Sequence, residues 1–96
     1  MILFAVSTQS HAYDAKQAYT KSIEKMNVEM QRGMDSDATT AWVKLMVAHH
    51  QGAIEMAQAV LKETKDPLIR EMAEKAIKEQ TREQTMLKFW ITKNAR

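Results

Sequence analysis

The sequence contains no cysteine, only two glycines and a single proline among its 96 residues. Without cysteine the chain has no disulfide framework, no thiol nucleophile and no cysteine-based zinc or iron–sulfur site. The scarcity of glycine and proline removes the usual helix breakers, and Ala, Met, Lys, Glu and Gln, which favour helices, are abundant. A chain of this length forms one domain at most. These properties predict an all-helical protein.

A block of charge of one sign is also absent. The chain has 14 Lys and Arg against 12 Asp and Glu, for a net charge of +2, and the two signs alternate along the sequence. A nucleic-acid-binding protein typically shows a clustered basic face, so we expect no nucleic-acid partner. The apolar run at the N-terminus is too short to cross a bilayer, so we expect no membrane span.

The N-terminal residues are typical of the end of an export signal. Residues 1–6 are apolar, and the small residues Ser10 and Ala12 occupy the positions that signal peptidase prefers before its cut. We interpret residues 1–12 as an export-signal remnant or a disordered N-terminus, and residues 13–96 as a single helical domain. Export predicts a periplasmic or secreted protein.

Three segments have the apolar spacing of helices, namely residues 14–32, 38–64 and 67–93. Gly33 ends the first segment, Asp37 and its neighbours begin the second, and Asp66 with Pro67 begins the third. Long helices with short connections lie antiparallel. The sequence therefore predicts an antiparallel bundle of three helices, with Trp42 and Trp90 as anchors of its core.

The most distinctive stretch of the sequence is residues 46–56, in the second predicted helix. His49 and His50 are adjacent there, inside the apolar arc of the helix. Adjacent helical side chains point about 100° apart, so the pair does not chelate one metal as residues four apart can. Met46 precedes the two histidines by three and four residues, and Met56 follows His49 by two turns. The spacing therefore predicts two half-sites that share Met46.

These side chains restrict the metal that such a site would hold. Thioether sulfur is a soft ligand and imidazole a borderline one, so the set favours Cu(I), with Cu(II) possible where histidine predominates. Met26 and Met30 repeat at a step of four on the first helix and supply further candidate ligands, as does Met86 on the third. Glu83 lies on an apolar face and could hydrogen-bond a histidine N–H, which would select the ring nitrogen that binds.

Two other functions remain open at this point. Methionine at helical spacing often fills cores, and buried histidines can simply be hydrogen-bonded, so a structural or partner-binding helical module is the second hypothesis. A ferritin-like di-iron oxidase is the third, but it needs Glu-x-x-His motifs, and Met46 stands where that glutamate would be. We therefore expect a protein without enzymatic activity.

Three motifs in a fixed order resemble the DUF305 family of small helical bacterial proteins, many of which are exported. They are residues 46–57, residues 66–73, which begin Asp-Pro, and residues 80–90, which contain Gln80, Glu83, Met86 and Trp90. The similarity extends over residues 19–94. It implies a ferritin-like fold and, as in some members, copper binding and a part in copper tolerance, here with a possible copper-handling partner protein.

The family positions that carry over to this chain are Met46, His49, His50, Met56, Glu83 and Met86. Two positions depart from the family pattern: Ala48 replaces a proline that relatives often have before the histidines, and Asn27 replaces a histidine that often follows Met26. Longer members carry two copies of the motif and this chain carries one, which predicts that two chains pair as a homodimer.

Overall fold

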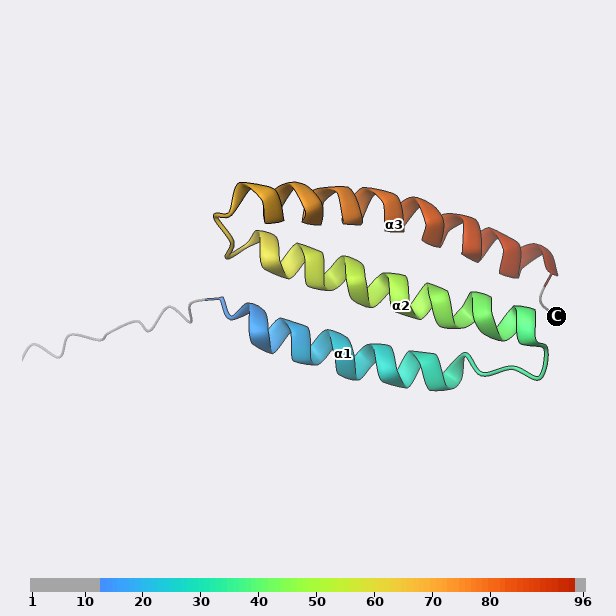
Figure 1. Cartoon of the computed structure of the whole chain (residues 1–96). Helices are drawn as coiled ribbons and strands as arrows, with labels where there is room; N and C mark the ends of the chain where they lie inside the picture. Colours follow the sequence, from blue (N-terminus) through green and yellow to red (C-terminus); the bar gives the residue numbers. More distant parts are fainter. Residues whose placement is uncertain (1–12, 95–96) are drawn as a thin grey trace, which may run out of the picture.

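The computed structural model describes residues 13–94, which form three α-helices: α1 (Ala15–Arg32), α2 (Ala38–Leu61) and α3 (Pro67–Asn94). α2 lies between α1 and α3 and runs antiparallel to both, while α1 and α3 do not pack against each other (Figure 1). The three helices therefore lie side by side in one layer. The prediction of an all-helical domain with three packed helices is confirmed. No helix within the described residues is long and apolar enough to cross a membrane.

Aspartate side chains cap the N-termini of α2 and α3. The Asp37 carboxylate accepts hydrogen bonds from the backbone N–H of Thr40 at 2.9 Å and from its hydroxyl at 2.8 Å. These bonds hold the pKa of Asp37 below its ordinary value. Asp66 accepts the backbone N–H groups of Leu68 and Ile69 at 2.9 and 3.1 Å, with Pro67 at the first helical position. Both predicted helix starts are confirmed.

Gly33 ends α1, but without the left-handed turn that a glycine at a helix end usually adopts. Its φ is −78°, in the right-handed helical region. A Cβ added to Gly33 would lie 3.1 Å from the Cβ of Lys44 on α2. Glycine at this position therefore allows the end of α1 to approach α2 closely.

The core of the described chain consists mainly of small side chains. Its buried apolar residues are Ala15, Ala41, Val43, Ala48, Ile54, Ala57, Ala59 and Ala73, and no large side chain among residues 13–94 is fully buried. The expectation that Trp42 anchors the core is wrong for the single chain, because 57% of its surface is exposed. Small residues allow α2 to contact both neighbours, but two neighbours cannot cover every side of one helix. Trp42 lies on a side that they leave uncovered.

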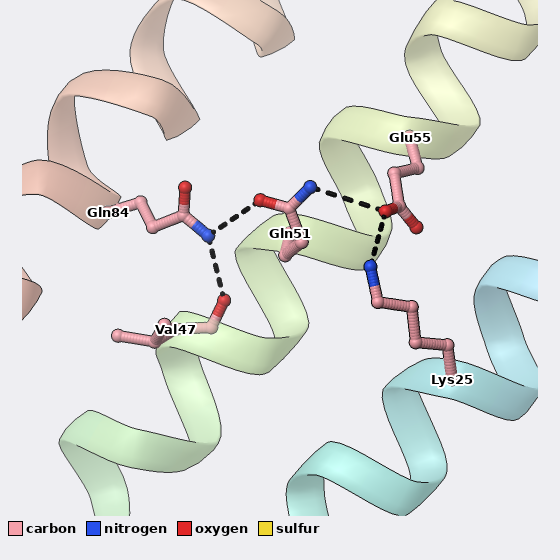
Figure 2. Close-up of polar contacts among 5 residues, drawn as sticks. All are labelled: Lys25, Val47, Gln51, Glu55 and Gln84. Atoms are coloured by element: carbon pink, nitrogen blue, oxygen red, sulfur yellow. Dashed lines mark hydrogen bonds and ion pairs between the residues drawn. The ribbon is translucent and has the colours of Figure 1, made fainter.

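A chain of polar contacts connects all three helices (Figure 2). The side-chain amide of Gln84 on α3, which is buried, donates to the carbonyl of Val47 at 3.1 Å and to Oε1 of Gln51 at 3.0 Å. Gln51 donates to Glu55 at 3.3 Å, and Lys25 of α1 donates to the same carboxylate oxygen at 3.0 Å. Each contact between helices forms only at one relative position of the two helices, so together the contacts fix the positions of α1 and α3 along α2.

Candidate metal-binding face

The layer has two different faces. One carries the polar network, beside a groove of about 430 Å³ whose lining includes Lys25, Arg32, Lys44 and Lys88. At 100° per residue, Met46 lies half a turn away from Glu55 on α2, so it belongs to the other face. The residues of the other face are found on each helix by counting 100° per residue from a residue of the polar network: Lys25 on α1, Glu55 on α2 and Gln84 on α3. Each of them lies about 100° or more around its helix from that network residue.

We call this second surface the open face. It consists of Ile23 and Met30 of α1, of Trp42, Met46, His49, Ala53, Met56 and Val60 of α2, and of Met72, Met86 and Trp90 of α3. Four of its large apolar residues are exposed, with 43% of Ile23, 57% of Trp42, 59% of Met72 and 61% of Met86 accessible, while Met30, Met46, Met56 and Trp90 are half-buried. Five of the predicted metal ligands, namely Met30, Met46, His49, Met56 and Met86, therefore lie on one uncovered apolar surface.

His50 lies at the edge of this face, between α2 and α3, and both of its ring nitrogens have partners. Nδ1 is 2.8 Å from the backbone carbonyl of Met46, and Nε2 is 2.7 Å from Oε2 of Glu83. A carbonyl oxygen only accepts hydrogen bonds, so Nδ1 carries the hydrogen. Nε2 donates to Glu83 when the ring is protonated, and its lone pair can bind a metal when the ring is neutral.

The contact that the sequence suggests between Glu83 and a histidine nitrogen is present, but Glu83 does not select the ring tautomer. The Met46 carbonyl, one turn back on the same helix, selects the ring tautomer of His50. Glu83 instead faces the nitrogen that would bind a metal. Its carboxylate is therefore placed to supply an oxygen ligand beside Nε2.

His50, Glu83 and Met86 line the same groove, an opening of about 610 Å³ between α2 and α3. Trp42 and Trp90 also line it, so its walls are mainly apolar. Glu83 and Met86 are three residues apart on α3 and share a side of that helix. The groove therefore combines an imidazole nitrogen, a carboxylate oxygen and a thioether sulfur.

His49 points away from His50, as helical geometry predicts. The two ring centroids are 6.3 Å apart with an interplanar angle of 68°, and His49 is exposed. Met46 is half-buried. Gly33 of α1 lies against Lys44 of α2, and this contact fixes the position of α1 along the axis of α2. By that register Met30 lies level with residues 47 and 48, within one turn of His49.

Met26 and Met56 lie apart from these groups. A Cβ added to Gly52 would lie 2.7 Å from Sδ of Met26, so the Met26 side chain occupies the contact between α1 and α2, on the side of α2 away from His50. Met56 follows His49 by seven residues, or about 10 Å along the helix. α2 is continuous through Ala48, where relatives often have proline.

Carboxylates and histidines alone do not form a metal site in the described part of the chain. Between residues 13 and 94, no three His, Asp or Glu side chains gather closely enough to hold an ion. A metal site on these residues therefore requires thioether sulfur, a second chain, or both. Neither the role of the Met46 carbonyl nor the Gln84 contacts could be predicted from the sequence. The only signal for Gln84 was its position among the apolar residues of the third helix.

Fold and site together define a small three-helix protein with histidine and methionine concentrated on one surface. The chain belongs to the family described as Domain of unknown function (DUF305), whose family model matches residues 5–91. The resemblance seen in the three sequence motifs is thereby confirmed. A search of curated proteins found no significant match.

Proposed function

We propose that this protein is a non-catalytic, exported copper-binding protein that sequesters copper or passes it to a copper-handling partner protein. The observation that carries the proposal is the placement of two histidines and five methionine thioethers on or beside one face of a chain that has no cysteine. Export rests on residues 1–12, which lie outside the described residues.

The donor atoms fit copper in two groups. His50, Glu83 and Met86 offer nitrogen, oxygen and sulfur in one groove, a mixture that suits either oxidation state. His49, Met46 and Met30 offer one imidazole and two thioethers, a softer set that favours Cu(I). Hard ions such as Mg²⁺ and Ca²⁺ prefer clustered oxygen ligands, which this face does not offer.

A homodimer is part of the proposal. A single layer of helices leaves the open face in water, and the described chain buries no large side chain fully. Contiguous exposed apolar surface of this kind commonly marks an interface. A second copy that covers the open face would supply the missing core.

The second candidate function is a helical module that binds a protein partner through the open face. The exposure of Trp42 and Met86 supports it, because these are residue types that interfaces favour. The melting temperature measured with and without copper distinguishes this function from copper binding. A ligand that binds only the native state raises its stability, so copper raises the melting temperature of a copper protein and leaves that of a simple module unchanged.

Competition against a Cu(I)-specific chelator under anaerobic conditions tests the proposal. We expect the parent protein to withdraw Cu(I) from the chelator and the His49→Ala/His50→Ala variant to withdraw far less. Met26→Leu is the matched control, because it removes a thioether that lies in the α1–α2 contact, and we expect it to compete like the parent. Equal competition by the histidine variant and the parent would show that the proposed site is wrong.

A further inference from the structure

We propose that the His49 copper site is shared between two antiparallel copies of the chain, with Met56 of one copy joining Met46 and His49 of the other. This rests on the proposed copper binding and dimerisation, and it adds which residues each chain contributes. The starting observation is that Met56 lies on the same face as Met46 and His49 but two turns from His49 in its own chain.

The open face is large enough for a stable dimer. On α2 the open face runs from Trp42 to Val60, which corresponds to a length of about 27 Å. Three helices side by side at spacings of about 8–10 Å form a surface about 25 Å wide, or about 700 Å² in all. A specific interface buries roughly 600–1,000 Å² of each partner. A second copy that covers the open face completely therefore buries enough surface to hold the pair together.

The distribution of side-chain size along the face favours an antiparallel pair. Trp42 and Trp90 lie at the end where α2 begins, and both line the same groove. Toward the other end the face carries Val60 of α2 and Met72 of α3, which are smaller than tryptophan. An antiparallel pair puts each bulky end against a smaller one, whereas a parallel pair puts Trp42 against its own copy and leaves space at the far end. Antiparallel helix dipoles add to this preference.

The register follows from the two-fold symmetry of a homodimer. Two identical faces overlap completely only if the symmetry axis passes through their common centre. On α2 the open face runs from Trp42 to Val60, so its centre lies at residue 51. Residues equally far from that centre then meet across the interface. Met46 lies level with Met56 of the second copy, and His49 lies level with the second copy's Ala53, whose small side chain leaves room for the ring.

This arrangement changes the ligands available to His49. In one chain Met56 is about 10 Å away along α2, whereas in the pair it lies within one helical turn of both Met46 and His49. Symmetry produces two such sites for each dimer. Each site takes His49 and Met46 from one chain and Met56 from the other, so Cu(I) bound there holds the two chains together.

Complementation between two defective variants tests the shared site. All chains carry His50→Ala, so that copper bound at the neighbouring groove does not contribute. His49→Ala and Met56→Leu are introduced into separately tagged chains, which are co-expressed, and the dimer that carries both tags is isolated. Bound Cu(I) is measured by metal analysis and chelator competition, and the dimer by its mass in solution. Met72→Leu, a change to an exposed methionine of the same face outside the proposed site, is the control.

In the mixed dimer, one of the two shared sites pairs an intact His49 with an intact Met56, and the other site has lost both. We therefore expect the mixed dimer to regain half of the parental Cu(I) capacity, although each variant alone has lost the site. Met72→Leu keeps the full capacity.

If the parental background binds Cu(I) and the mixed dimer recovers none, the site lies within one chain. The proposal of a shared site is then wrong, although copper binding survives. Absence of any dimer also overturns the shared site. Absence of Cu(I) binding in the parental background overturns the proposed function with it.

Discussion

Replacing Gly52 by alanine measures how closely α1 packs on α2. In an isolated helix the change stabilises by about 1 kcal/mol, because alanine favours the helix over glycine. Here the new Cβ would lie 2.7 Å from Sδ of Met26 and 3.3 Å from its Cβ. The sulfur can rotate away, but the Met26 Cβ is attached to the backbone of α1, so the helices must separate by a few tenths of an ångström.

The strain outweighs the gain in helix propensity. Overpacking of this kind costs about 1–3 kcal/mol, so we expect Gly52→Ala to destabilise the protein by about 1 kcal/mol. For a domain of this size that corresponds to a fall in Tm of about 4–8 °C. Urea unfolding followed by circular dichroism measures the change in the free energy of unfolding.

A double-mutant cycle separates the two contributions. In a Met26→Gly background both the sulfur and the Cβ that meet the new side chain are gone, so Gly52→Ala should stabilise by up to about 1 kcal/mol. The coupling between the two positions is then about 1–2 kcal/mol. If Gly52→Ala stabilises the parent and the Met26→Gly variant equally, Met26 does not pack on Gly52, and the register of α1 against α2 is wrong.

Two further predictions concern the polar contacts. Burial raises the pKa of Glu55, but hydrogen bonds, first that from Lys25, outweigh it and leave the pKa below its ordinary value of 4.5. Glu55 therefore stabilises the fold above pH 4.5 and loses its contribution as the pH falls through the lowered pKa. Glu55→Gln should lower the free energy of unfolding at pH 7 and make it fall less steeply in acid, which urea unfolding at a series of pH values would measure. Arg70→Ala should cost about 1–2 kcal/mol in the same assay, because the guanidinium donates to the carbonyl of Leu61, the last residue of α2, at 2.8 Å and to that of Thr64, in the connection to α3, at 2.9 Å. Arg82→Ala, at an exposed position of α3, is its control, and an equal loss there would contradict the role assigned to Arg70.

The helices could be predicted because their signals are local. Asp37 and Asp66 act on N–H groups two or three residues away, so the start of each helix follows from the residues around it. The C-terminal end of α2 was predicted less well. Periodicity extends it to Thr64, whereas the structure ends it at Leu61, with a turn before Asp66.

The direction of the apolar arc of α2 could not be predicted from periodicity. The pattern shows which residues are apolar but not which neighbour covers them. α1 packs on the side that contains Gly52, and α3 packs on the side that contains His50 and Val47. The stripe with Met46 and His49 lies between these two contacts and stays uncovered, which is why residues expected in a core form a surface.

By itself the sequence determined that the chain is helical, where α2 and α3 begin, and that His49 and His50 diverge around Met46. These features depend on interactions within about four residues, which the order of side chains specifies directly. The tertiary structure alone decided that Glu83, 33 residues away, contacts Nε2 of His50, and that Met26 packs in a helix contact. Such pairings depend on the register between helices, and that register follows from close approach at Gly33 and Gly52 and from the amide contacts of Gln84, none of which is visible in a local pattern.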